Sequence, residues 1–148
     1  MTKAMIGIDL GGTNVKTAVV SREGEVMGKD SRPTEAEEGL DAVLGKMVEG
    51  VDAALHDANI RRSDVLAIGI GAPGPMNWQT GVVFAPPNLP GWKDVPLAQL
   101  MRERLGVPVY VDNDANVACY GEFWLGAGRN VDSMVLLRLM LAVRDELD

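Results

Sequence analysis

The first part of the chain alternates between apolar and polar positions in the manner of short strands. Residues 4–10 and 14–21 carry apolar side chains at about every second position, and residues 25–31 form a third, more polar segment. A period of two is typical of strands, and the glycine-containing segments between them are short enough for tight turns. The pattern therefore predicts an opening meander of three strands.

The next segment has the period of a helix. Apolar residues recur there at intervals of three and four, which places them on one face of a helix about six turns long. We expect this helix to begin near Glu35 and to end just before Asn59. Thr34 and Glu37 have the spacing of a capping box at its start. The apolar face consists of Leu40, Val43, Leu44, Met47, Val48, Val51, Ala54 and Leu55.

Two further strands and two further helices are predicted beyond this helix, with one long loop among them. Residues 65–71 are nearly all apolar, as in a parallel strand covered by helices on both faces, and residues 107–112 are predicted to form a further strand. Helices are predicted over 95–105 and 115–125 from their apolar spacing and flanking glycines. Six of the eight prolines lie within residues 72–96, which predicts a rigid loop without regular structure.

The order of these elements predicts an α/β domain. Three strands are followed by helix, strand, helix, strand and helix, and residues 133–143 begin like one more strand. Such an order indicates a mixed sheet with helices on both faces. A length of 148 residues fits one domain of ordinary size.

Composition narrows the class of protein. The 14 basic and 21 acidic residues give a net charge of −7, which argues against nucleic acid or a membrane surface as partner. Cys119 is the one cysteine of the sequence, which excludes a disulfide framework. His56 is the one histidine, which disfavours a histidine-based metal site or catalytic triad. We expect a cytoplasmic domain without a signal peptide, with Cys119 as a small buried residue of the last helix.

The first candidate site is the run DLGGT at residues 9–13, between the first two strands. Successive backbone N–H groups in a glycine turn form a concave anion site, and the missing Cβ atoms let a phosphate approach. Thr13 adds a hydroxyl donor, and Asp9 is able to hold Mg²⁺ directly or through water. The alternative is an ordinary hairpin turn in which Gly11 and Gly12 only supply positive φ angles.

A second candidate site follows the strand at 107–112, where Asn113, Asp114 and Asn116 stand close together. The carboxyl ends of strands are where open α/β sheets bind ligands. The alternative is a helix cap and nothing more, because Asp and Asn are favoured at helix N-termini.

The third candidate site combines residues 71–75 (GAPGP) with residues 88–92 (NLPGW). Asn88 can donate and accept hydrogen bonds at once, which suits the hydroxyl pairs of a sugar. The alternative is a proline-stiffened surface loop whose Trp92 packs on the core.

Together, and in this order, these segments resemble the ROK family of sugar kinases and repressors, and its glucokinases in particular. The resemblance covers roughly residues 4–137. It implies the ribonuclease H-like lobe of the actin-like ATPase superfamily, with residues 1–137 as an N-terminal lobe and residues 138–148 as an atypical tail. The motifs that carry it are IGIDLGGT (6–13), IGIGAPGP (68–75), PNLPGW (87–92) and DNDAN (112–116), which runs on to Gly121 and Glu122.

The resemblance implies a role for each candidate residue and a reaction for the whole protein. That reaction is phosphorylation of a hexose, glucose first among the candidates, with ATP and Mg²⁺ as cofactors and a homo-oligomer as the assembly. Mannose, N-acetylglucosamine and N-acetylmannosamine stay open as acceptors, and polyphosphate stays open as the donor. The implied catalytic base is Asp114. The residues implied to bind the nucleotide phosphates and Mg²⁺ are Asp9, Gly11, Gly12 and Thr13. Those implied to bind the sugar hydroxyls are Gly74, Asn88, Asn113 and Asp114.

The chain also departs from the family pattern. In the family a second glycine-rich phosphate segment and then a sugar- and zinc-binding segment follow, whereas this sequence has no glycine after Gly128. We therefore expect no zinc site, little or no kinase activity from the chain alone, and an apolar surface around residues 133–143 that promotes self-association.

Three alternatives to a kinase lobe are open to test. A non-catalytic sugar-binding or dimerising module is the first. A different actin-like ATPase, such as an acetate kinase or a chaperone ATPase, is disfavoured because Asn88 and the Asn113-Asp114 pair match the sugar side of the family. A repressor is disfavoured because the first strand begins by residue 4, without a preceding helix-turn-helix.

Overall fold

The computed structural model describes residues 2–136, and a five-stranded sheet forms their centre. The strand order is β3-β2-β1-β4-β8. Strand β1 pairs antiparallel with β2, and β2 with β3, while β4 lies parallel to both β1 and β8. The predicted meander and mixed sheet are thereby confirmed. The bounds are β1 Ala4–Leu10, β2 Asn14–Ser21, β3 Val26–Pro33, β4 Val65–Ala72 and β8 Val109–Asn113.

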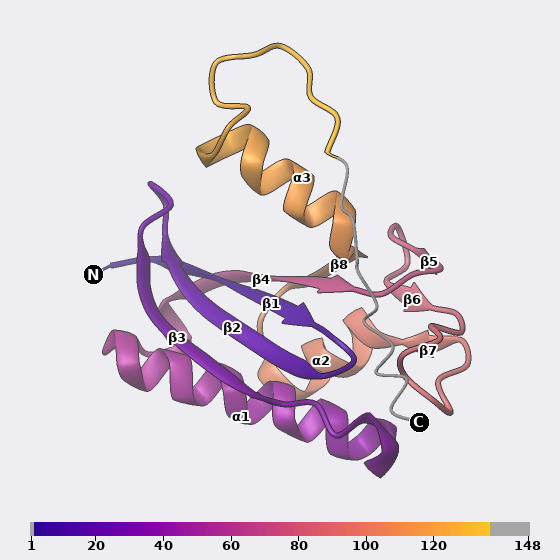
Figure 1. Cartoon of the computed structure of the whole chain (residues 1–148). Helices are drawn as coiled ribbons and strands as arrows, with labels where there is room; N and C mark the ends of the chain where they lie inside the picture. Colours follow the sequence, from indigo (N-terminus) through magenta and orange to yellow (C-terminus); the bar gives the residue numbers. More distant parts are fainter. Residues whose placement is uncertain (1, 137–148) are drawn as a thin grey trace, which may run out of the picture.

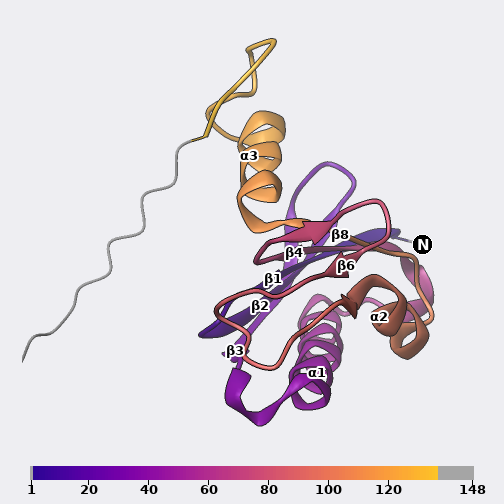
Figure 2. The same cartoon turned by 90° about the vertical axis from the view of Figure 1, so that its right-hand side faces the viewer.

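Helices cover both faces of this sheet, as the sequence predicts. Helices α1 (Leu40–Ala58) and α2 (Leu97–Leu105) lie on one face. Helix α3 (Asp114–Leu125) lies on the other, where it contacts β4 and β8 (Figures 1 and 2). The fold is therefore α/β.

The alternation along β1 decides which side chains enter the core. Ile6, Ile8 and Leu10 are buried, at 0–3% exposure. Gly7 and Asp9 point to the opposite face, where they line a cavity together with Val117 of α3. Because side chains alternate along a strand, burial of Ile8 and Leu10 forces Asp9 onto the face of α3.

The predicted capping box at the start of the long helix is wrong. A short 3₁₀ helix, η1 (Ala36–Glu38), comes first, and α1 begins only at Leu40 without a side-chain cap. The reason is local backbone geometry, because Glu35 and Gly39 have φ angles of 49° and 98°, which no helix accommodates. The end of α1 is confirmed, since Asn59 adopts the left-handed conformation directly after Ala58.

The segment 72–96, predicted to lack regular structure, contains a small antiparallel sheet. Its three strands each span two residues, and their order is β5-β6-β7. Strands this short carry no readable periodicity, which is why the sequence gives no sign of them. Their bounds are β5 Met76–Asn77, β6 Val82–Val83 and β7 Val95–Pro96.

Helix α3 contributes no buried residue to the described core. Cys119, predicted to be buried, is only half-buried, because α3 touches the sheet at β4 and β8 and its far end projects from it. Residues 133–136 have no strand geometry, so that part of the strand predicted at 133–143 is wrong, and the remainder lies outside the described residues. A helix with the length and apolarity to cross a membrane is absent from residues 2–136.

Candidate functional site

The candidate residues meet at one edge of the large sheet. Strands β1, β4 and β8 are parallel, so their carboxyl ends lie side by side, and the register pairs Asp9 with Gly71 and Gly71 with Asp112. Neighbouring strands are about 4.8 Å apart, so the backbones at Asp9 and Asp112 lie about 10 Å apart. The first and second candidate sites are therefore adjacent in the fold.

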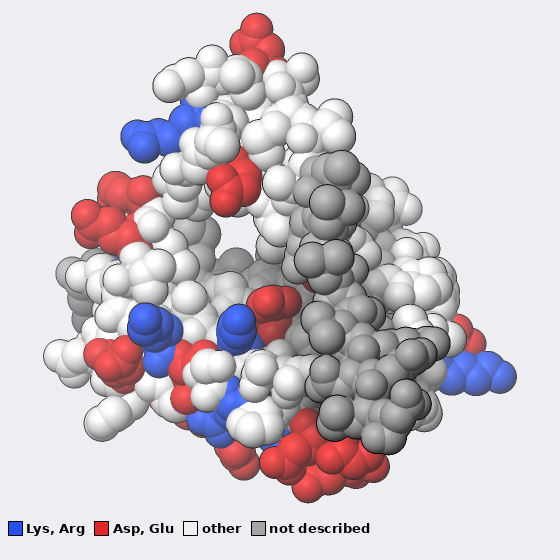
Figure 3. Space-filling view, in the orientation of Figure 1, with Lys and Arg blue, Asp and Glu red and all other residues white. Residues whose placement is uncertain are grey.

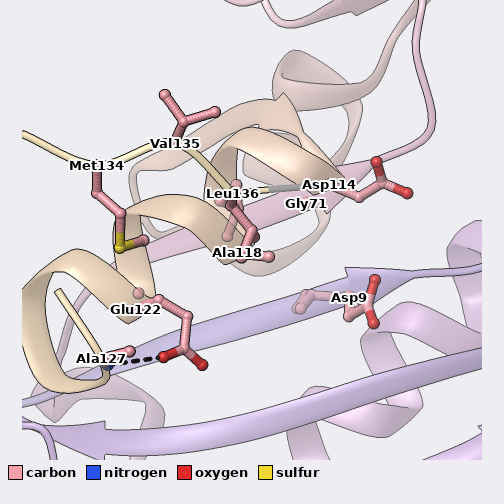
Figure 4. A pocket seen from close by; sticks show the side chains of 12 residues that line it. Asp9, Gly71, Asp114, Ala118, Glu122, Ala127, Met134, Val135 and Leu136 are labelled. Atoms are coloured by element: carbon pink, nitrogen blue, oxygen red, sulfur yellow. Dashed lines mark hydrogen bonds between the residues drawn. The ribbon is translucent and has the colours of Figure 1, made fainter. Parts of the chain in front are cut away.

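A cavity of about 660 Å³ opens at this edge, between the sheet and α3. Asp9 and Asp114 line it from β1 and from the start of α3, and Gly71, Ala118 and Glu122 complete part of its wall (Figure 4). Figure 3 shows the hollow between α3 and the sheet, with acidic and basic side chains along its lower edge. This volume is in the ordinary range of small-molecule sites.

The turn at residues 11–13 offers backbone donors, although not all of those predicted. The Gly11 N–H donates to the Asn14 carbonyl at 3.0 Å, and a Cβ on Gly11 would lie 2.8 Å from that same oxygen. Among residues 2–136, the N–H groups of Gly12 and Thr13 and the Thr13 hydroxyl have no hydrogen-bond partner. Gly11 thus closes the turn, while Gly12 and Thr13 present free donors.

Thr34 stabilises this turn through two hydrogen bonds, a role that the sequence did not predict. It is fully buried, and its hydroxyl donates to the Gly11 carbonyl at 2.6 Å. Its N–H donates to the Thr13 carbonyl at 2.8 Å. No motif signals this pairing, because Thr34 lies 23 residues from Gly11 and only the register of β2 with β3 brings them together.

The third candidate site lies directly beside the turn. A Cβ added to Gly12 would lie 2.7 Å from the Asn88 Cβ, so the two residues are in close contact. Asn88 is exposed, whereas its neighbour Leu89 is buried, which anchors the loop and leaves the amide free at the surface. Trp92 is only 4% exposed and belongs to the core, so the packed alternative for this tryptophan is confirmed.

Asn113 caps α3 and keeps its amide donor free. Its Oδ1 accepts a hydrogen bond from the Ala115 N–H at 2.9 Å, which confirms the cap. Its Nδ2 has no partner among the described residues and lies against Gly74, where an added Cβ would approach it to 2.9 Å. Helix capping and ligand binding are therefore compatible at this residue, because they use different atoms.

Asp114 is half-exposed at the first position of α3. Its Oδ1 accepts from the Ala115 N–H at 2.8 Å, and its Oδ2 has no partner within residues 2–136. The preceding Asp112 orders the segment, since its Oδ1 accepts from the Asn113 N–H at 2.7 Å and from Asn116 Nδ2 at 3.3 Å. One carboxylate oxygen of Asp114 is thus available to a ligand in the cavity.

These groups suit a nucleotide phosphate with Mg²⁺. Asp9 is exposed, and its carboxylate has no partner in the described part of the chain. No group of three His, Cys, Asp or Glu residues gathers as a metal site within residues 2–136. Mg²⁺ is commonly held by one or two carboxylates with phosphate oxygens and water, so Asp9 and a bound phosphate suffice.

Comparison with known proteins defines the class and then the family. Solved structures of ROK kinases superpose on this chain, and they share the actin-like ATPase fold, so the chain has that fold. Residues 5–140 match the sequence profile of the ROK family. The chain belongs to the ROK family, as its motifs imply.

Three relatives illustrate the similarity. The glucokinase of Halalkalibacterium halodurans is 37% identical over 134 residues, which is 90% of this chain and 40% of the relative. A ROK hexokinase from Thermus thermophilus superposes with a TM-score of 0.78 at 35% identity, over 86% of this chain and 40% of the other. A ROK family glucokinase from Streptomyces griseus, solved with glucose and AMPPNP, gives a TM-score of 0.76 at 33% identity, over 86% and 38% of the two chains. This chain thus spans about two fifths of the length of these relatives.

Proposed function

We propose that this chain is the N-terminal lobe of a hexose kinase that transfers a phosphoryl group from ATP to a sugar hydroxyl. The observation that supports it best is the common cavity of Asp9 and Asp114, together with the free amides of Asn88, which contacts Gly12 of the turn, and of Asn113, which precedes Asp114. In this proposal residues 1–137 belong to the lobe, and residues 138–148 are a tail whose sequence departs from the family pattern. Glucose is the first acceptor to test, because the first relatives named above are glucokinases or hexokinases.

Each backbone or side-chain group of the site has one task in the proposed reaction. Bound MgATP supplies the transferred phosphoryl group, and phosphoryl transfer needs positioning and charge stabilisation more than covalent help. The N–H groups of Gly12 and Thr13 donate to phosphate oxygens, and Asp9 holds the metal. Asn88 and the Nδ2 of Asn113 donate to sugar hydroxyls.

Asp114 is the proposed general base. Its Oδ2 is free to accept a hydrogen bond from the acceptor hydroxyl. The hydroxyl proton passes to that oxygen as the sugar oxygen bonds to the γ-phosphorus and the bond from that phosphorus to the bridging oxygen breaks, with ADP as the leaving group. Kinases of this fold exclude water by closing two lobes, and this chain spans 40% of a family glucokinase. We therefore propose that the 148-residue chain binds sugar and MgATP with little turnover.

Calorimetry and a product assay test the proposal on the chain itself. We expect heat on titration with millimolar glucose, and the affinity of Asn88→Ala should fall about fivefold to tenfold, as expected for one lost hydrogen bond. The control is Asp41→Asn, an exposed carboxylate at the start of α1 on the other face of the sheet, which should bind like the wild type. No heat with glucose, mannose, N-acetylglucosamine or N-acetylmannosamine overturns the sugar site.

The alternative is a non-catalytic sugar-binding module, favoured by the limited share of the relatives that the chain covers. Glucose 6-phosphate formed from ATP or polyphosphate by the wild type and lost in Asp114→Asn decides for the kinase. Sugar binding without MgATP binding decides for the module.

A further inference from the structure

We propose that Thr34 is a positioning residue for the phosphate-binding turn at residues 11–13. This inference rests on the proposed function, which gives the turn its ligand. Thr34 touches no proposed ligand itself and acts through the backbone of the turn.

Thr34 donates hydrogen bonds to both ends of the turn. Its hydroxyl donates to the Gly11 carbonyl at 2.6 Å, and its N–H donates to the Thr13 carbonyl at 2.8 Å. Gly11 is held a second time by its own N–H, which donates to Asn14. Gly12 therefore lies between two fixed peptide groups, and the donors that remain free are those assigned to phosphate.

Thr34 is in turn connected to helix α1 through Lys46. Lys46 Nζ donates to the Thr34 carbonyl at 3.2 Å and to the carboxylates of Glu35 and Glu38 at 2.6 and 3.1 Å. All three polar atoms of Thr34 are thus engaged, in a residue with 0% exposure. A buried threonine with this set of bonds connects α1 on one face of the sheet to the turn at its edge.

This arrangement matters because glycine turns are costly to order. Glycine loses more backbone freedom than any other residue when it is fixed, and two of the three turn residues are glycines. Donors fixed before a ligand arrives bind a charged oxygen without that cost at the moment of binding. Removing the Thr34 hydroxyl leaves the turn free to sample other conformations and lowers its affinity for phosphate.

Three variants of the 148-residue chain test the proposal. Thr34→Val keeps the shape and loses the hydroxyl, and Thr34→Ser restores it. The matched control is Thr17→Val, because Thr17 is 2% exposed and its hydroxyl has no partner in the described structure. Circular dichroism checks that each variant is folded, and the readouts are amide hydrogen exchange and the dissociation constants for MgATP and glucose.

In Thr34→Val we expect about tenfold faster exchange of the amides of residues 11 and 34, and MgATP binding about tenfold weaker, with glucose binding unchanged. Thr34→Ser and Thr17→Val should match the wild type in all readouts. A Thr34→Val variant that exchanges and binds like Thr17→Val overturns the role of Thr34 and leaves the proposed function standing. A wild-type chain that binds no MgATP overturns the proposed function and, with it, the ligand of the turn.

Discussion

At the scale of single residues, the site depends on two glycines, because a Cβ at either position would clash with a neighbouring asparagine. Gly12 lies against Asn88, and Gly74 lies against the amide of Asn113. In each pair a glycine gives space to an asparagine that carries a proposed sugar contact. Gly12 thus lets the proposed phosphate-binding turn at residues 11–13 lie close to Asn88, and Gly74 lets its own loop lie close to Asn113.

The variant Gly12→Ala tests this packing. Its Cβ would lie 2.7 Å from the Asn88 Cβ and 3.3 Å from the Asn88 carbonyl oxygen, so one of the two segments must move. Overpacking of this kind costs about 1–3 kcal/mol, which we expect in the free energy of unfolding from urea denaturation. Gly7→Ala is the control, because nothing lies within 4 Å of a Cβ at Gly7. Equal stability of the two variants contradicts the close contact.

At the scale of elements, α3 contributes its first residue and several later ones to the wall of the cavity. It buries no residue in the described core, yet its first residue, Asp114, lines the cavity, and Asn113 caps it directly before Asp114. The cap at Asn113 therefore contributes both to the stability of the helix and to the geometry of the site.

Two substitutions at Asn113 separate these contributions. Asn113→Asp keeps the oxygen that accepts from Ala115 and loses the Nδ2 donor, so stability should hold while glucose affinity falls. Asn113→Ala loses both, and the free energy of unfolding should also drop by about 1 kcal/mol. Urea denaturation and calorimetry measure the two effects. Glucose binding by Asn113→Asp at wild-type strength excludes Nδ2 as a sugar donor.

The link between η1 and α1 predicts a pH dependence. The hydrogen bond with Lys46 lowers the pKa of Glu35, and this contribution to stability is lost as the pH falls through that lowered pKa. Burial of Lys46 by itself lowers its pKa, but its bonds to Glu35 and Glu38 outweigh this and raise the pKa, so the contribution of Lys46 is lost as the pH rises through the raised value. The ionic link therefore makes its full contribution to stability between about pH 5 and pH 10.

The variant Lys46→Met reports on this link. Its urea midpoint should lie below that of the wild type at pH 7, and the difference should shrink below about pH 4 and above about pH 11. Lys93→Met is the control, since Lys93 is exposed and has no ion pair within residues 2–136. A difference that stays constant over this pH range excludes the ionic contribution.

At the scale of the whole molecule, an apolar surface extends over α3 and the residues after it. Tyr120, Trp124 and Val135 are 71%, 45% and 95% exposed. The sheet beneath carries a further cavity of about 920 Å³, lined partly by β1, β2 and β3. Large exposed apolar patches favour association, so we propose a homo-oligomer in which this surface is covered.

Sedimentation velocity tests the proposed association. We expect the sedimentation coefficient to rise with protein concentration, and the rise to disappear in the double variant Tyr120→Glu, Val135→Glu, because two charges oppose burial of the patch. Gln79→Glu is the control, an exposed residue of the β5–β6 turn. A wild-type chain that stays monomeric at the highest concentration contradicts this prediction.

Much of this picture was determined by the sequence alone. The period of two fixed the faces of β1 and β2, and the period of three to four fixed α1, because these elements are long and half-buried. The motifs also identified the residues that gather at the sheet edge, including Asp9 and Asp114. Local pattern sufficed where each residue's environment follows from its neighbours in the chain.

Tertiary structure alone decided the contacts between distant segments. Thr34 has the spacing of a capping residue, yet the pairing of β2 with β3 places it beside Gly11, and its hydroxyl donates to the Gly11 carbonyl. The contact of Gly12 with Asn88 joins segments 76 positions apart in the sequence. Such contacts depend on strand register and loop closure over long separations, and these are properties of the folded chain that no local pattern encodes.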